Sequence, residues 1–346
     1  MINSLQHPVK QLRINKLFKE IMDSGYYSEG KQTEEAEEAL VDQTGCPTLL
    51  FNSCGSALYT AFRYYSELGY KQAVMQSNTF YATGQMALEA GITPVLCDSR
   101  PDCPSMSADS MVEALKASGA KLVVLTHIGG WLAKDYSKIA AYCVSNNLIL
   151  MEDCAHCFGV SGAGKLGHTA CWSFYSTKAV PVGEAGALST CDAGLFIYAS
   201  RFRSYGKVKT PRAEAGIEYR GGMNLRVSEW AAAVLRVQLG MLPLILQYRK
   251  NDAQKLQSIA PCVLTGETNW YKYPVPASYS KEYQTVGHVY KRSDQLDVCI
   301  PTARKPVPLN NSHHWAHNCC SLPVGEDSYE LYNSEELKKV LCRSEK

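Results

Sequence analysis

The sequence lacks the features that mark membrane and nucleic-acid-binding proteins. No apolar run approaches the roughly 20 residues of a transmembrane helix, and residues 1–7 lack the apolar core of a secretory signal. The formal net charge is only +2, so no strongly basic surface for nucleic acid is indicated. Internal repeats and low-complexity tracts are also absent. We therefore expect an ordinary globular, cytoplasmic protein that acts on small molecules.

A disulfide scaffold is not indicated either, although the chain has 14 cysteines. They are scattered, and several, such as Cys97, Cys143 and Cys171, lie in apolar segments. In a chain of this length the pattern is typical of mostly buried thiols in a reducing compartment. Cys154 and Cys157 have CxxC spacing, but no second CxxC completes a zinc site.

The cluster His313-His314-Trp315-Ala316-His317 resembles a metal site only superficially. No carboxylate stands at a useful helical spacing from these histidines, and we expect the stretch to form a loop with solvated or substrate-edge side chains. We predict no metal site in this protein.

Strand-like apolar runs alternate with amphipathic helical patterns along the first half of the chain. This alternation predicts an α/β fold with a mainly parallel mixed sheet flanked by helices. The expected strands are 48–51, 73–75, 93–96, 121–126 and 148–151, and the expected helices are 56–65, 82–90, 110–118 and 137–145.

Longer helical patterns follow at 195–205, 228–239 and 244–259. Gly240 and Pro243 mark a break before the last of them. From residue 261 onward the sequence is rich in proline, tyrosine and asparagine and has only short apolar runs. We therefore predict a large domain at 1–240 and a smaller C-terminal α+β domain at 241–346.

The most informative stretch is Trp172-Ser173-Phe174-Tyr175-Ser176-Thr177-Lys178, which places a lysine in a loop after an apolar segment. An acidic pair, Glu152-Asp153, ends an earlier strand-like run. Pyridoxal phosphate (PLP) joins its enzyme as a Schiff base on a lysine and needs a carboxylate at its ring nitrogen. Lys178 and Asp153 are the candidates for these two roles.

Two further stretches fit a PLP site. Small residues at 52–57, including Gly55 and Ser56, join a strand to a helix, where free N–H groups and the positive helix end would face a phosphate. Ser173 could add a hydroxyl. Aromatic residues at 80–81 follow another strand, and one ring could stack on the pyridine, although a core role is an equal alternative.

In this order, the motifs resemble those of the DegT/StrS-type sugar aminotransferases, which have the type I fold of aspartate aminotransferase. The resemblance runs from about residue 25 to 246. It implies that Asp153 binds the pyridine nitrogen, Lys178 is the catalytic lysine, Ser173 binds phosphate and Phe80 stacks on the ring. The chain departs from the family in having Tyr175 where a histidine is usual.

The same resemblance implies roles for four further residues. His156, at a position that is often glutamine, would contact the ring oxygen of the cofactor. Gly55 and Ser56 would form the phosphate turn, where a threonine common in the family is replaced by Gly55. Asn224 would reach the phosphate in the neighbouring subunit, which implies a homodimer with shared active sites.

The implied reaction moves an amino group from glutamate or glutamine to a keto-sugar, most often nucleotide-linked in this family. Lys178 would anchor the cofactor and then act as the general base. Members that have lost the lysine catalyse dehydration instead, so its presence favours amino transfer. Other PLP chemistry on an amino acid (elimination, cyclisation or carbon–carbon bond formation) and a non-catalytic relative remain open alternatives.

Overall fold

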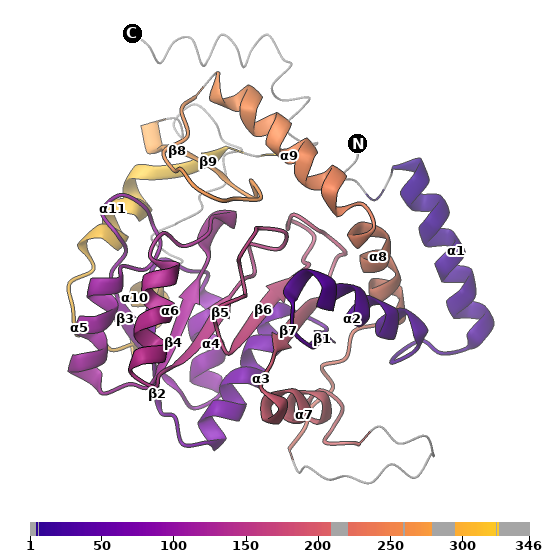
Figure 1. The fold of residues 1–346 in the computed structure, drawn as a ribbon, viewed down its shortest axis with the longest axis horizontal. Helices are drawn as coiled ribbons and strands as arrows, with labels where there is room; N and C mark the ends of the chain where they lie inside the picture. Colours follow the sequence, from indigo (N-terminus) through magenta and orange to yellow (C-terminus); the bar gives the residue numbers. More distant parts are fainter. Residues whose placement is uncertain are drawn as a thin grey trace.

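The computed structural model describes residues 5, 7–208, 221–258, 260–278, 295–322 and 324. Its centre is a seven-stranded sheet in the order β1-β7-β6-β5-β4-β2-β3 (Figure 1). Strand β7 runs antiparallel to both of its neighbours, whereas the other pairs are parallel. The predicted mainly parallel mixed sheet is thus confirmed. The strands are β1 Thr48–Phe51, β2 Gln72–Gln76, β3 Thr93–Cys97, β4 Leu122–Thr126, β5 Ile149–Asp153, β6 Thr169–Ser173 and β7 Gly186–Thr190.

Both faces of the sheet are covered by helices, which explains why nearly all of its strand residues are buried. On one face pack α3 (Cys54–Glu67), α4 (Tyr81–Glu89) and α7 (Ala193–Phe202). On the other face pack α5 (Ala108–Ser118) and α6 (Tyr136–Ser145) at one side and α1 (Pro8–Ser24), α2 (Lys31–Thr44) and α8 (Glu229–Leu239) at the other.

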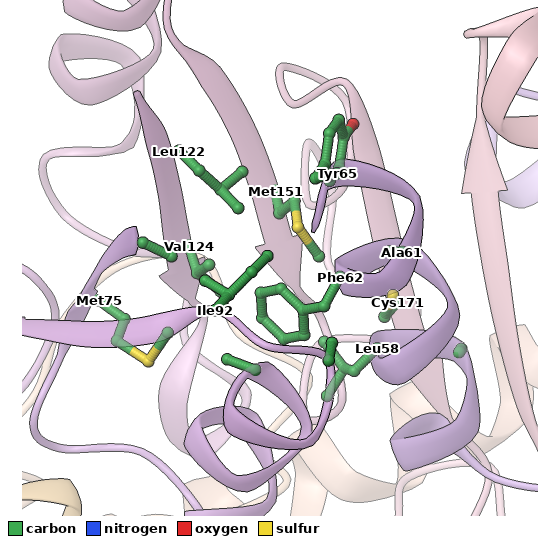
Figure 2. Packing of buried hydrophobic residues seen from close by; sticks show 14 of the residues in the cluster. Leu58, Ala61, Phe62, Tyr65, Met75, Ile92, Leu122, Val124, Met151 and Cys171 are labelled. Atoms are coloured by element: carbon green, nitrogen blue, oxygen red, sulfur yellow. The ribbon is translucent and has the colours of Figure 1, made fainter. Parts of the chain in front are cut away.

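Successive strand residues serve opposite faces, because side chains alternate along a strand. Met75, Val124 and Met151 pack in the core on the α3 side, whereas Val74 and Val123 pack against α5 and α6. Figure 2 shows the α3 side, where residues of α3 meet those of β2, β4 and β5. The central strands thereby bury both faces, and their ends are held in fixed positions.

The helix boundaries follow from ordinary capping residues. Ser53, Ser107 and Asp192 each accept a hydrogen bond from a backbone N–H in the first turn of the helix that follows. Gly119, with a φ of 72°, ends α5 in the left-handed conformation that glycine adopts easily.

The C-terminal part contributes to two regions of the structure. Helix α9 (Leu242–Gln257) and the antiparallel pair β8 (Tyr273–Pro276) and β9 (Cys319–Leu322) share a small apolar cluster. Figure 1 shows them beyond one end of the main sheet. The intervening α10 (Leu296–Cys299) instead joins the main core through Leu296 and Ile300.

Histidines 313, 314 and 317 lie in helix α11 (Asn310–Asn318), so the prediction of a loop there is wrong. The short sequence gave no apolar stripe long enough to indicate a helix. Trp315 anchors this helix, because its indole N–H donates to the carbonyl oxygen of Arg100 at 2.9 Å.

Within the described residues, no single helix is long and apolar enough to cross a membrane, and only the bent pair α8 and α9 meets the criteria of length and composition when taken together.

Most of the described cysteines are buried thiols, but Cys46 and Cys191 form a disulfide. It joins the residue two before β1 to the residue just after β7, across 145 positions of sequence. The scattered spacing of the cysteines gave no sign of this pair.

We expect the double variant Cys46→Ser, Cys191→Ser to unfold more easily than the oxidised protein. Closing so long a loop restricts the unfolded chain, which by the entropic model is worth about 5 kcal/mol at most. Chemical denaturation with and without reductant measures the difference, with Cys262→Ser as the control. An equal loss of stability in reductant would show that the serines, not the lost bond, cause the effect.

Candidate active site

One cavity of about 470 Å³ opens at the carboxyl ends of the central strands, where α/β sheets commonly bind ligands. Side chains or backbone from the ends of β2, β4, β5 and β6, from the start of α3 and from the C-terminal part line it. Of the residues predicted for the site, the lining includes Lys178, Asp153, His156, Gly55, Phe80 and Ser173.

Asp153, the last residue of β5, is 3% exposed. One carboxylate oxygen accepts a 2.6 Å hydrogen bond from the Thr83 hydroxyl, and the other accepts one from the Ala155 N–H at 3.0 Å. A carboxylate has room for about four such bonds, so Asp153 keeps acceptor capacity for a donor inside the cavity. The Thr83 contact also fixes its orientation.

Lys178 follows β6 in a tight turn. The backbone N–H of Lys178 donates to the Tyr175 carbonyl oxygen at 2.9 Å, and the Phe174 side chain in this turn is fully buried. At the start of β7, Gly186 leaves no space for a side chain, because a Cβ there would lie 2.2 Å from the Cys54 nitrogen. This close approach brings the lysine loop beside the start of α3.

His156 is a neutral donor in this structure. Burial, with the nearby charges of Lys178 and Lys272, holds the pKa of His156 well below its usual value. Its Nδ1 accepts the Gly129 N–H at 3.0 Å. The proton therefore resides on Nε2, which suits donation to an anionic oxygen.

The start of α3 has the form of an anion site. Ser53 caps the helix, and the first residues, Cys54 and Gly55, line the cavity with N–H groups that have no partner within the helix. A Cβ on Gly55 would meet its nearest neighbour at 3.7 Å, so the glycine is not required by space. Ser56 is not among the residues that line the cavity, and its hydroxyl donates to Asn52 Oδ1 at 2.6 Å.

Two aromatic residues mark the rim. Phe80, predicted to stack on a pyridine ring, precedes α4, is 50% exposed and contacts the Tyr81 ring with centroids 4.2 Å apart. Tyr175 is also exposed at this rim.

Asn224 lies outside the cavity. It is exposed and forms an isolated antiparallel bridge with Ser204. Its bridge partner Ser204 is not one of the other predicted site residues.

Several cavity residues were not predicted from the sequence. Tyr271 and Lys272 come from the segment before β8, and Gln295 from the segment before α10. Asn78 accepts a hydrogen bond from the Gln295 amide. No periodic pattern marks these positions, because long-range folding alone brings them to the sheet.

Glu152 supports the site from the opposite side of β5. It is fully buried and accepts hydrogen bonds from His127 Nε2 (2.9 Å) and the Tyr136 hydroxyl (2.8 Å). The backbone N–H groups of Gly164 and Gly167 donate to it at 2.8 and 2.6 Å. Burial alone would raise the pKa of Glu152, but these donors together lower it.

Among the described residues, one group has ligand atoms close enough for a metal: His127, Glu152 and Cys154. The hydrogen bonds of Glu152 already account for its placement. Burial raises the pKa of Cys154 and Cys157 well above the usual value, as expected for inert thiols. His313 pairs with Asp297 at 3.0 Å.

The donor set fits PLP. Asp153 is a buried carboxylate with acceptor capacity in the cavity, and Lys178, which lines the same cavity, supplies an amine. His156 supplies a neutral N–H donor, and the start of α3 supplies a phosphate cradle. An α/β sheet with these groups at its carboxyl edge defines the class of type I PLP enzymes.

Comparisons with known proteins agree with this class. Residues 9–273 match the model of the DegT/DnrJ/EryC1/StrS aminotransferase family. UDP-4-amino-4,6-dideoxy-N-acetyl-beta-L-altrosamine transaminase of Helicobacter pylori is 28% identical, covering 90% of this chain and 86% of that protein. dTDP-3-amino-3,6-dideoxy-alpha-D-galactopyranose transaminase of Aneurinibacillus thermoaerophilus is also 28% identical, covering 97% and 93%.

The solved structure of ntda from Bacillus subtilis with bound cofactor PMP shares the fold, with a TM-score of 0.84 and 18% identity. The match covers 99% of this chain and 83% of that one. The chain belongs to the DegT/DnrJ/EryC1/StrS family of PLP-dependent aminotransferases.

We predict that Glu152→Gln destabilises the fold by about 3–5 kcal/mol. The NH2 group of the new amide would face N–H and O–H groups that now donate hydrogen bonds to the Glu152 carboxylate. Denaturation at neutral pH measures this change in stability, with the exposed Glu113→Gln as a control.

Since the pKa of Glu152 is lowered in the folded protein, its contribution to stability is present above the usual carboxyl range and is lost as the pH falls. The gap between wild type and variant should therefore narrow below about pH 4. A gap independent of pH would contradict an ionised Glu152.

Proposed function

We propose that this aminotransferase moves an amino group from glutamate or glutamine to a keto-sugar carried by a nucleotide. The cavity supports this proposal, because it brings a lysine, a buried carboxylate and an anion cradle together at one sheet edge. The two transaminases named above, which act on UDP- and dTDP-linked amino sugars by their names, support a nucleotide-linked acceptor.

When bound, PLP supplies a carbonyl that takes up the amino group and a ring that withdraws electrons. Asp153 would hold a proton at the ring nitrogen, and the hydrogen bond from Thr83 fixes the orientation of its carboxylate. His156 would donate from Nε2 to the ring oxygen. Lys178 would anchor the cofactor and then move the proton at the reacting carbon.

The remaining predicted residues would bind and orient the cofactor. Gly55 and the start of α3, with Ser56 behind them, would hold the phosphate together with Ser173. Phe80 would cover one face of the ring.

Asn224 points to a homodimer. It is exposed and is not among the residues that line the cavity of its own chain, which supports a phosphate contact in a second subunit. The two active sites of the dimer would then each use residues from both chains.

We expect L-glutamate or L-glutamine to convert the bound cofactor to its amine form, seen as loss of its long-wavelength absorbance band. Lys178→Ala should abolish both this conversion and the borohydride-fixed adduct found by mass spectrometry. Lys138→Ala, an exposed lysine of α6, is the control. If neither donor changes the wild-type spectrum, elimination, cyclisation or carbon–carbon chemistry on an amino acid becomes the better assignment.

We expect Asn224→Ala to weaken PLP binding by about tenfold or more, because a hydrogen bond to a charged group contributes about 1.5–3 kcal/mol. Cofactor titration measures the loss of affinity, sedimentation tests whether the dimer persists, and Asn146→Ala is the control.

Hybrid dimers of Asn224→Ala and Lys178→Ala subunits give a sharper test of the shared site. One site then carries both changes and the other neither, so about half of the wild-type activity should return at limiting PLP. A hybrid with no more than half the activity of the Asn224→Ala dimer would rule out a shared site.

A further inference from the structure

The segment 268–272, which precedes β8, is held in place by a buried arginine. Arg249 of α9 is 5% exposed, and its guanidinium donates to the carbonyl oxygens of Asn269, Trp270 and Tyr271 at 3.0–3.2 Å. Burial lowers the pKa of Arg249 to about 10. Placing a charged group in the interior to hold three carbonyls is costly, so the position of this segment is strongly constrained.

Asn269 ties the same segment to the cofactor-binding region. Its amide nitrogen donates to the carbonyl oxygens of His156 and Phe158 at 2.8 and 3.0 Å, and its oxygen accepts the Tyr271 N–H at 2.9 Å. The packing is so close that a Cβ on Gly130 would lie 2.2 Å from the Asn269 oxygen.

The backbone of this segment is also strained. Trp270 has a φ of 55°, a left-handed conformation that is unfavourable for a bulky residue and costs about 1–3 kcal/mol. Such strain persists only where surrounding contacts enforce it, and it concentrates at functional sites. The contacts of Arg249 and Asn269 supply that enforcement.

The side chain that this segment places in the cavity is Tyr271. Its hydroxyl lies 3.2 Å from the Thr177 hydroxyl, and the Lys178 Nζ lies 4.9 Å from its ring centre. The His156 ring packs against it with centroids 4.7 Å apart, and the Lys272 Nζ lies 5.1 Å from the same ring. Tyr271 therefore contacts the lysine proposed to move protons.

Two cations change the acidity of this phenol. Burial alone would raise the pKa of Tyr271, but the charges of Lys178 and Lys272 and the hydrogen bonds from Thr177 and Lys178 bring it below its usual value. His156 cannot share the proton readily, because burial and the same two cations disfavour its charged form.

We propose that Tyr271 is the proton-exchange partner of Lys178, a role that rests on the proposed function of Lys178. The Tyr271 phenolate accepts a proton from the Lys178 ammonium, so that an N–H bond breaks and an O–H bond forms. A neutral amine with a free electron pair and a neutral phenol result, and the reverse transfer restores both charges. While Lys178 is charged, a cation–π contact with the Tyr271 ring holds Nζ near the phenol.

The first test removes the hydroxyl but keeps the ring. In Tyr271→Phe, the Lys178 ammonium loses the phenolate charge that stabilises it, so more of the reactive neutral amine is present. Labelling of Lys178 by an amine-reactive reagent in the cofactor-free full chain, followed by mass spectrometry, should therefore become several-fold faster. Single-turnover amino transfer should fall about 100-fold, within the usual range for proton-transfer groups, with little change in KM. Tyr273→Phe, which removes a buried hydroxyl bonded to Gln257 and Ala260, is the matched control.

The second test observes the phenol directly. With ¹³C-labelled tyrosine, one resonance of the wild-type chain should titrate below the ordinary tyrosine range near 10 and be absent from Tyr271→Phe. Lys272→Gln should return that titration toward the ordinary value while leaving the tyrosine in place. This variant keeps the test decisive even if Tyr271→Phe does not fold.

The outcomes separate the two proposals. Unchanged Lys178 labelling and transfer rate in Tyr271→Phe, or no tyrosine that titrates early and responds to Lys272→Gln, would overturn the role of Tyr271 while leaving aminotransfer intact. Failure of the wild type to accept amino groups, with the early-titrating tyrosine still present, would overturn only the proposed substrates.

Discussion

The hydrogen-bonded carboxylate of Glu152 is the interaction on which the site most depends. Because side chains alternate along β5, Glu152 and Asp153 lie on opposite faces of one strand end. Glu152 gathers His127, Tyr136 and the backbone of residues 164–167 on the far side, so the strand end cannot shift. Asp153, the next residue of the strand, is therefore held in a fixed position. The hydrogen bond from Thr83 also ties its carboxylate to α4.

The other half of the site is built by close backbone approach rather than by charge. Gly186 allows β7 to touch the start of α3, which brings the lysine loop and the anion cradle together. The antiparallel direction of β7 makes this possible, because it returns the chain from the lysine loop to the same edge of the sheet. The lysine, the carboxylate and the anion cradle thus meet at one edge of the sheet, although they come from segments that are far apart in the sequence.

Much of the large sheet and half of the site could be predicted from the sequence. Strands with continuous apolar character and helices with clear caps carry local signals, so β1 was expected at its observed bounds and α3 to α6 within about two residues of theirs. Asp153 could be found because it ends such a strand, and Lys178 because it lies in the loop that follows an apolar segment.

The missed features depend on contacts between distant segments. Tyr271 reaches the cavity only through Arg249 and Asn269, and no local pattern encodes that arrangement. Helix α11 was missed because its nine residues include three histidines and few apolar side chains, and its anchor, Trp315, binds a carbonyl more than 200 residues away. The disulfide of Cys46 likewise has a partner that spacing cannot identify.

The way Arg249 holds its segment has an evolutionary consequence. Its guanidinium binds backbone carbonyls, which are the same whatever side chain follows, so the loop keeps its place when residues 271 and 272 change. The position of this segment therefore does not depend on which side chains it places in the cavity. Side chains on this wall can therefore change the chemistry of the cavity while the backbone beneath them stays in place.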